Sequence, residues 1–196
     1  MVGPNKQFNQ DEALNKALET FWAKGFEATS MQDLVLNMGI NRASMYQTYG
    51  NKHALFIATL DRYISSNLAH FKQSLDVPGS PLDNLHKVFD FFINAGQQGK
   101  AYGCFINNTA VEMGPHDPLV AEKIRQFWLQ FESLLVNMIE RAKEKGELAA
   151  HTESKNLAIL LNIALQGLAV KIKTNSAPEE LRNSTDFLFN LIKQYR

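Results

Sequence analysis

Five residues with small or polar side chains, spaced within one short segment, are the first place where this sequence indicates chemistry. They are Arg42, Ala43, Ser44, Tyr46 and Gln47. An arginine can pair with the acceptor edge of guanine or with a phosphate, and a glutamine amide can pair with the edge of adenine. Their short neighbours permit close approach to base edges. The segment therefore predicts a helix that reads the major groove of double-stranded DNA.

Phosphate contacts hold such a helix in place without reading sequence. Tyr46, Tyr49 and Lys52 carry the hydroxyl and ammonium groups suited to this task. The formal net charge of the whole chain is zero, and the charged residues among residues 34–52 are Arg42 and Lys52. Because the basic excess is so small, we expect a narrow DNA contact and no broad electrostatic stripe.

Helix start and stop signals place these residues in a helix-turn-helix. An apolar stripe predicts a first helix over residues 9–24. A second helix begins behind Thr29 or Ser30, each of which has a capping partner three residues later, and it ends at Gly39. A third helix starts behind Asn41. This arrangement is typical of a major-groove reader. An ordinary helical hairpin, in which Gly39 only ends a helix, has the same spacing.

The rest of the chain also has the pattern of helices, and no segment alternates as a strand requires. A fourth helix over residues 52–73 ends before a Pro- and Gly-containing segment from Asp76 to Pro81. Further helices are expected near residues 81–98, 104–113, 117–145, 153–174 and 178–195. The sequence thus predicts an all-α fold of about nine helices. A helix-turn-helix domain over residues 1–50 is followed by a second domain over residues 51–196, and the fourth helix links them.

Aromatic residues gather in the middle of the second domain. They are Phe89, Phe91, Phe92, Tyr102, Phe105, Phe127, Trp128 and Phe131. A mostly apolar cavity with a few polar groups is typical of a small-molecule site, here for an apolar or aromatic ligand. The polar candidates are His86, Asn107, Asn108, Glu112 and Gln166. The alternative is that the aromatic rings fill an ordinary core and the polar groups face water.

Several classes of protein have little support in the sequence. One cysteine, Cys104, excludes an internal disulfide framework and a multi-cysteine metal site. The five histidines form no close pair, so we expect no metal and no cofactor. No apolar run approaches bilayer length and the first residues lack a secretory pattern, which predicts a cytoplasmic protein without a membrane partner. An α-helical enzyme using Glu112 or His86 as acid or base is an alternative, but the sequence offers no nucleophile–base spacing or cofactor loop.

The last two predicted helices carry more apolar surface than a solvent-facing helix needs. The candidates for an interface between two copies are Leu157, Leu161, Ala164, Leu165, Leu168, Leu188, Leu191 and Ile192. Two copies on a twofold axis present two recognition helices to two half-sites, which is the arrangement that reads a palindromic operator. The alternative is that these residues form the internal core of one subunit.

The stretch of residues 9–56 resembles the N-terminal domain of the tetracycline-repressor (TetR) family of bacterial transcriptional regulators. The matching text is ALETFWAKGFEATSMQDLVLNMGINRASMYQTYGNKHALF. The resemblance implies that the third helix is the recognition helix and that four of its residues meet bases or adjacent phosphates: Arg42, Ala43, Ser44 and Gln47. It places Tyr46 and Lys52 at phosphates, and Thr29 or Ser30 at the phosphate-facing start of the second helix.

The resemblance also implies a homodimer joined by its last two helices, with an inducer bound between the fourth and eighth helices. The candidate ligand contacts are His86, Phe89, Phe92, Cys104, Phe105, Asn108, Glu112, Phe127, Phe131 and Gln166. The chain departs from the family in its N-terminal arm, residues 1–8, which holds only Lys6 where many members carry several arginines. The sequence therefore does not predict minor-groove reading by this arm.

The run from Gly103 to Glu112, followed by His116-Asp117-Pro118, resembles a segment of one subgroup of the family. In some relatives a cysteine in this run reacts with electrophiles or oxidants. Cys104 lies near a predicted helix N-terminus, a position that lowers a thiol pKa. The alternative is that Cys104 is a packed small hydrophobe.

The predicted function is that of a sequence-specific DNA-binding transcriptional regulator, a repressor that a small molecule releases from its operator. The alternative is a helical small-molecule-binding or interaction protein that does not bind DNA.

Overall fold

The computed structural model describes residues 8–97 and 102–194, and within these ranges the chain forms helices and no strand. The predicted all-α fold is confirmed. The N-terminal arm lies almost wholly outside the described residues. The helices are α1 (Gln10–Lys24), α2 (Met31–Met38), α3 (Arg42–Tyr49), α4 (Lys52–Leu75), α5 (Pro81–Gln97), α6 (Phe105–Glu112), α7 (Pro118–Glu144), α8 (Ser154–Lys173) and α9 (Pro178–Gln194).

Local capping fixes where the first three helices begin. The side chains of Asn9 and Asn41 accept hydrogen bonds from backbone amides three residues later, at 3.1 and 2.8 Å. Ser30 forms a full capping box with Asp33, so α2 starts behind Ser30 and not behind Thr29. Each cap satisfies backbone donors that the first turn of a helix leaves unpaired.

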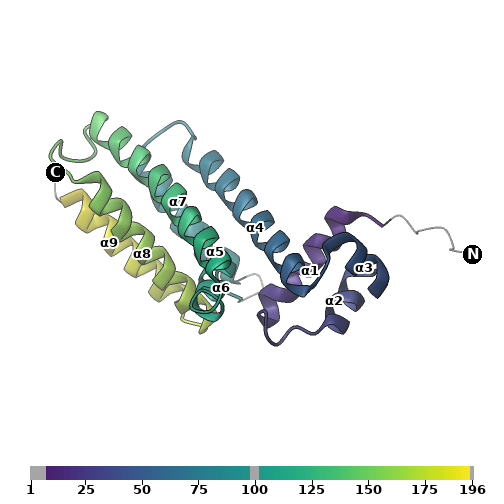
Figure 1. Cartoon of the computed structure of the whole chain (residues 1–196). Helices are drawn as coiled ribbons and strands as arrows, with labels where there is room; N and C mark the ends of the chain where they lie inside the picture. The colour runs from purple at the N-terminus through teal and green to yellow at the C-terminus, as the bar shows by residue number, and fades with distance from the viewer. Residues whose placement is uncertain (1–7, 98–101, 195–196) are drawn as a thin grey trace, which may run out of the picture.

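The first three helices form a small head at one end of the molecule (Figure 1). Its core includes Phe21 from α1, Leu34 from α2 and Met45 from α3, all fully buried. Gly39 ends α2 in the left-handed conformation, with φ of 70°, which glycine adopts without a steric penalty. The turn to α3 is therefore tight, and α3 packs on the head through one side only.

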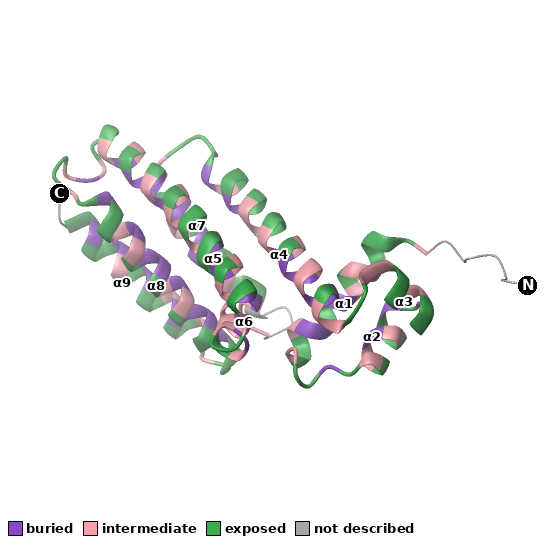
Figure 2. Ribbon diagram, viewed as in Figure 1, coloured by how far each residue is buried: buried purple, intermediate pink, exposed green. Residues whose placement is uncertain are grey.

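The long helix α4 runs from the head into a body built from α5 to α9 (Figure 1). In the body, α7 packs against α8, α5 packs against α9, and α4 packs against both α5 and α7. The buried side of each helix faces the centre of the body, while the outer sides of α8 and α9 carry many exposed residues (Figure 2). The body thus has one apolar interior that α4 shares with the head.

Helix α8 is the one helix of the described chain that is long and apolar enough to cross a membrane by length and composition alone. This differs from the sequence prediction that no apolar run is that long. Leu161 and Leu168 on α8 are buried in the body of the protein, and Leu160 and Ile163 lie on its outer side. Its apolar composition therefore follows from having two apolar sides, so it is weak evidence for a membrane span.

Candidate nucleic-acid interface and ligand cavity

Helix α3 presents a polar outer side because one residue anchors its inner side. Met45 is fully buried, whereas Arg42, Ala43, Tyr46 and Gln47 are exposed. The Arg42 guanidinium lies 5.8 Å from the centre of the Tyr46 ring, so the two side chains lie together on the outer surface. Ser44 is half-buried, and its backbone amide donates to the Asn41 cap. The shape fits a helix that enters a groove with its outer side first.

The residues flanking α3 have different surroundings. The Tyr49 hydroxyl donates to the backbone oxygen of Gln10 at 3.3 Å, and burial raises the pKa of this phenol. The Lys52 ammonium lies 4.4 Å from the centre of the Phe26 ring, beside the turn between α1 and α2. Ser30 is exposed at the start of α2. Tyr49 is thus joined to the start of α1, Lys52 lies by the turn that follows α1, and Ser30 is exposed.

Thr29 requires a correction. We expected Thr29 or Ser30 to face a phosphate at the start of α2. Thr29 is 0% exposed, and its hydroxyl donates to the backbone oxygen of Gly25 at 2.5 Å. A buried hydroxyl that already donates to a backbone oxygen cannot contact a phosphate. Of the two residues, Ser30 therefore remains the candidate phosphate contact.

The carboxylate of Glu112, at the end of α6, binds the turn between α1 and α2. One oxygen accepts from the Phe26 amide at 3.0 Å and the other accepts from the Glu27 amide at 2.9 Å. The carboxylate approaches Gly25 so closely that a Cβ at this position would lie 2.8 Å from an oxygen of Glu112. Glu112 therefore joins the body to the head, and it does so with charge-assisted hydrogen bonds.

Two further contacts join the head and α4 to the body. The Trp22 indole on α1 donates to the backbone oxygen of Gly103 at 3.1 Å. His53 at the start of α4 lies 2.5 Å from Asp117, whose other oxygen caps α7. Together with Glu112, these contacts join the head and the start of α4 to the region around α6 and the start of α7.

A cavity lies in the body between α4, α5, α6, α7 and α8. Its lining residues are Tyr63, Asn67, Phe71, Phe92, Cys104, Asn107, Phe127, Trp128, Phe131, Asn162, Leu165, Gln166 and Ala169. The cavity itself is narrow, about 30 Å³, within a larger space of about 390 Å³ between these side chains that includes open solvent. Aromatic rings form much of the wall, with amide groups among them, which is the usual character of a small-molecule site.

The cavity brings together half of the predicted ligand contacts: Phe92, Cys104, Phe127, Phe131 and Gln166. Glu112 lies outside the lining because its carboxylate binds the head. Asn108 also lies outside it, since its side chain donates to the backbone oxygen of Tyr102 and accepts from Lys173. Phe105 packs on Phe56 and Tyr63 with ring centres 5.7 and 5.4 Å apart.

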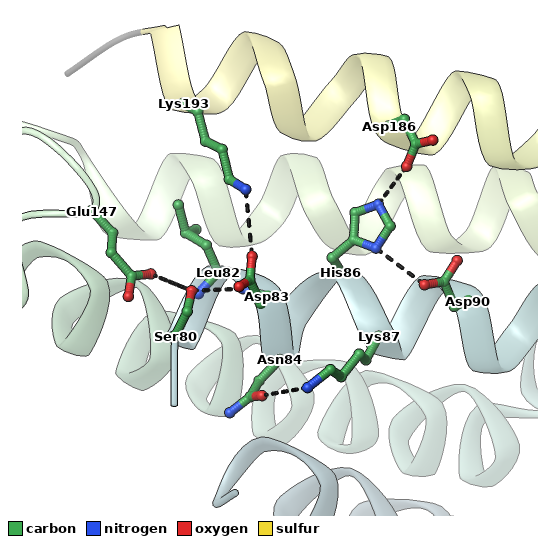
Figure 3. A network of polar contacts seen from close by, with 10 residues as sticks. All are labelled: Ser80, Leu82, Asp83, Asn84, His86, Lys87, Asp90, Glu147, Asp186 and Lys193. Atoms are coloured by element: carbon green, nitrogen blue, oxygen red, sulfur yellow. Dashed lines mark hydrogen bonds and ion pairs between the residues drawn. The ribbon is translucent and has the colours of Figure 1, made fainter. Parts of the chain in front are cut away.

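His86 and Phe89 lie on the side of α5 that faces α9. Figure 3 shows His86 between Asp90 of its own helix and Asp186 of α9, at 3.1 and 2.7 Å. Phe89 packs edge-on against Phe189 of α9, with ring centres 5.3 Å apart. Neither side chain lines the cavity, so we leave both out of the candidate ligand site.

Several lining residues were not among the predicted ligand contacts. Tyr63, Asn67 and Phe71 come from α4, and Asn162 comes from α8. The α4 residues recur every four positions, a spacing that puts them on one side of a helix. That spacing was a usable signal, but none of the ligand contacts predicted from the sequence lies on α4.

Cys104 caps the start of α6 with no side-chain hydrogen bond to the helix. The residue is partly exposed as a whole, but its thiol lies by the cavity, 3.9 Å from the Tyr63 hydroxyl. Burial raises the pKa of the Cys104 thiol above its usual value. The position near a helix N-terminus therefore does not produce the lowered pKa that the sequence suggested.

The apolar outer surface of α8 and α9 differs from the predicted interface. Leu161, Leu165, Leu168 and Ile192 are buried within one protomer, so they are corrected to core residues. Leu157, Ala164 and Leu188 are partly buried, and Leu191 is exposed. The large apolar side chains on the outer surface of the two helices are Leu160, Ile163, Val170, Phe187 and Leu191. Phe187 is 64% exposed, which is unusual for a side chain of this kind.

A helix-turn-helix head, a long linking helix and an all-helical body with a cavity together define a ligand-binding DNA-binding regulator. Residues 13–59 match the family described as bacterial regulatory proteins, tetR family. Residues 81–188 match the family described as tetracyclin repressor-like, C-terminal domain. The chain belongs to the tetracycline-repressor family of transcriptional regulators.

Several individual proteins are similar to this chain over nearly its whole length. The uncharacterised HTH-type regulator YezE of Bacillus subtilis is 33% identical over 97% of this chain and 100% of its own length. The HTH-type transcriptional repressor ComR of Escherichia coli is 29% identical over 91% of this chain and 86% of its own length. A structure of the TetR-family regulator CifR with operator DNA has 24% identity and a TM-score of 0.85, covering 95% of this chain and 98% of that one.

Removing the Glu112 carboxylate should loosen the head. We expect Glu112→Ala to weaken operator binding roughly tenfold, because two backbone amides lose a charged acceptor. Glu112→Gln retains one acceptor oxygen, so its operator affinity should lie between those of the wild type and of Glu112→Ala. Fluorescence anisotropy with operator DNA measures the effect. The matched control is Glu144→Ala, an exposed glutamate on α7, and wild-type binding by both Glu112 variants would contradict this role.

The raised pKa of Cys104 predicts a slow thiol. At pH 7 the folded protein should react with iodoacetamide roughly tenfold more slowly than the urea-unfolded chain, since the thiolate is the nucleophile. The rate should rise as the pH is increased toward the raised pKa. Mass spectrometry of timed samples gives both rates. A folded protein that reacts as fast as the unfolded chain would show an activated thiol instead.

Proposed function

We propose that this protein is a homodimeric transcriptional repressor that reads a palindromic operator with α3 and leaves it when a small molecule fills the cavity. The observation that carries the proposal is the outer side of α3, where exposed Arg42, Tyr46 and Gln47 surround a helix anchored by buried Met45. Gln47 and Arg42 suit base edges, and Tyr46 suits a phosphate. Ala43 and Ser44 permit close approach.

The proposed contacts at the margin of this surface are Ser30, Tyr49 and Lys52. All three lie on the head or at its junction with α4, and Lys52 lies beside the turn that Glu112 binds. The start of α2 offers backbone amides and a helix dipole to a phosphate. With Lys52 and Arg42 as the charged contributors, the interface remains narrow and positions α3 by a few contacts.

Release follows from the position of the cavity. Tyr63, Asn67 and Phe71 in its wall belong to α4, the same helix that enters the head. Half-sites on DNA lie about 34 Å apart, so a small tilt of α4 in each subunit disturbs simultaneous docking. The ligand must prefer the tilted geometry, because a ligand with equal affinity for both states shifts nothing.

The proposal includes the division of the chain. Residues 1–50 form the DNA-binding domain and residues 51–196 the ligand-binding and dimerisation domain, with α4 as the link. We place the protein in the cytoplasm, where its operator is, and assign it no enzymatic activity. His86 and Glu112, the acid and base candidates for an enzyme, lie outside the cavity and are hydrogen-bonded to other parts of the chain.

Operator binding tests the proposal through α3. Genomic binding-site selection with the purified protein supplies the operator. We expect Arg42→Ala to weaken binding roughly ten- to a hundredfold, the usual cost of losing a base contact. Tyr46→Ala should weaken binding to all sequences alike. Fluorescence anisotropy against operator and scrambled DNA at several salt concentrations measures both effects.

The matched control for this experiment is Arg125→Ala. Arg125 is an exposed arginine on α7 that pairs with Glu122 at 2.7 Å, and it lies outside the head. Its removal should leave operator affinity unchanged. Binding by both α3 variants at wild-type affinity would favour the alternative, an interaction protein that does not read DNA through this helix.

The exposed apolar surface of α8 and α9 is the proposed dimer interface. Introducing a charge there should separate the subunits, because an unpaired buried carboxylate is costly. We expect Phe187→Asp and Ile163→Asp to sediment as monomers at concentrations where the wild type is dimeric. The control is Leu129→Asp, at a similarly exposed leucine on α7. A dimer that persists in both variants would place the interface elsewhere.

A further inference from the structure

A second cavity, here called the junction cavity, lies where the head meets the body. Leu18 and Trp22 of α1 form its wall on the side of the head. Tyr63 of α4, Phe91 of α5 and Ile172 of α8 belong to its wall on the side of the body. Its volume is about 350 Å³, whereas the narrow cavity described above has a volume of about 30 Å³. Small-molecule pockets usually have volumes of about 300 to 1,000 Å³, so the junction cavity can hold a molecule of two rings as it stands.

The junction cavity adjoins the narrow cavity. Tyr63, Asn67, Phe92 and Ala169 line both of them. The two cavities differ in their other lining residues, because α7 contributes to the narrow cavity and α1 contributes to the junction cavity. A molecule in the junction cavity would therefore contact a helix of the head directly. The described lining residues of the narrow cavity include none from α1.

Two contacts hold Trp22 in the wall of the junction cavity. Its indole Nε1 donates to the backbone oxygen of Gly103 at 3.1 Å, and Gly103 is itself a lining residue. The indole ring packs edge-on against Tyr63, with ring centres 5.1 Å apart. Leu18 lies one turn earlier on α1, so both side chains are on the same side of this helix. The head therefore presents a wall that is ordered before a ligand arrives, which lowers the entropic cost of binding.

The exposed lining residues mark the rim of the junction cavity. They are Ser66, Phe91 and Ala95. Phe91 is 48% exposed, and its ring packs beside that of His70 with ring centres 4.6 Å apart. A large apolar side chain at the mouth of a cavity is favourable for binding, because an apolar ligand covers it and removes it from water.

The wall of the junction cavity opposes a charged ligand. Its described lining residues include no Asp, Glu, Lys, Arg or His. Burial raises the pKa of Tyr63, which keeps this phenol uncharged at neutral pH. An anion or a cation would lose hydration without gaining a partner of opposite charge. The faces of aromatic rings attract a cation, but this attraction is weaker than the hydration that an enclosed ion loses.

We propose, building on the ligand-gated function above, that the junction cavity binds an uncharged aromatic molecule of two rings. The rings of Trp22, Tyr63 and Phe92 pack on the molecule, and Leu18 and Ile172 complete the apolar contact. The molecule touches α1 and α4 together, so it contacts the head and the linking helix at the same time.

Three probes that share a 2-naphthyl group test the class of ligand by calorimetric titration. They are 2-naphthylmethanol, 2-naphthoate and 2-naphthylmethylammonium. The alcohol should bind roughly tenfold more tightly than either ion at pH 7, because each ion loses hydration on entering a wall that has no charged partner.

Fluorine NMR locates the bound alcohol. The chain contains two tryptophans, and Trp22 lines the junction cavity whereas Trp128 lines the narrow cavity. Protein labelled with 5-fluorotryptophan gives one signal for each tryptophan, and Trp22→Phe and Trp128→Phe assign the two signals. Binding of 2-naphthylmethanol should shift the Trp22 signal by more than the Trp128 signal.

A matched pair of variants on α4 tests the site by blocking it. Ser66→Phe places a ring at the rim of the junction cavity and should weaken binding of the alcohol roughly tenfold or more. Ser65→Phe places the same ring at the neighbouring exposed position, which is outside the lining, and should leave the affinity unchanged. Both serines are exposed, so neither change should unfold the chain.

Binding of either ion as tight as that of the alcohol would overturn the proposal, and so would no binding of any probe. A larger shift of the Trp128 signal, or wild-type affinity in Ser66→Phe, would also overturn it. Operator binding by the probe-free protein is measured alongside. A protein that binds operator but fails these tests contradicts this inference alone, whereas a protein that binds no operator contradicts the proposed function.

Discussion

The ring of Phe56 on α4 packs against rings from both parts of the molecule. Its centre lies 5.0 Å from Phe21 and 5.1 Å from Phe26 in the head, and 5.7 Å from Phe105 at the start of α6. Protein interiors are packed as densely as organic crystals, so a displacement of one of these rings is transmitted to its neighbours. This apolar contact holds the head against the body. Apolar packing does not by itself fix the orientation of the head on the body. The Glu112 carboxylate fixes it through two hydrogen bonds to the adjoining turn.

The same group of aromatic rings reaches the cavity. Phe105 and Trp22 both pack on Tyr63, with ring centres 5.4 and 5.1 Å apart, and Tyr63 lines the cavity. A molecule in the cavity therefore touches α6 through Asn107 and is separated from Trp22 of α1 by the Tyr63 side chain. Two distant sites in a protein can be coupled through contiguous packing of this kind when the element that joins them has two discrete arrangements. Helix α4 suits that role because its residues contact the head at one end and the cavity further along.

The helix-turn-helix could be predicted closely because its signals are local. Caps, glycine stops and apolar spacing act within a few residues, and every helix lies within a few residues of its predicted bounds. Thr29 and Ser30 were harder to separate because both have a capping partner, and only the burial of Thr29 against α1 decided between them. The candidate ligand site was harder to predict from the sequence. Glu112 and His86 are polar residues on amphipathic helices that were predicted to contact a ligand, but their partners outside their own helices lie 85 or more and 100 residues away.

The sequence by itself determined the all-α fold, the position of the third helix and its outward residues, because a period of 3.6 residues and end signals are properties of a short segment. Only the tertiary structure decided which side of α8 is internal. Leu161, Leu165 and Leu168 form one apolar stripe, and Leu160, Ile163 and Val170 form another. Both stripes satisfy the same periodicity, so the period cannot choose between them. The choice depends on the rotation of α8 about its own axis, which is fixed by its packing against α7. The residues that meet there, such as Glu132 and Asn162, are 30 positions apart, too far for a local signal to specify the contact.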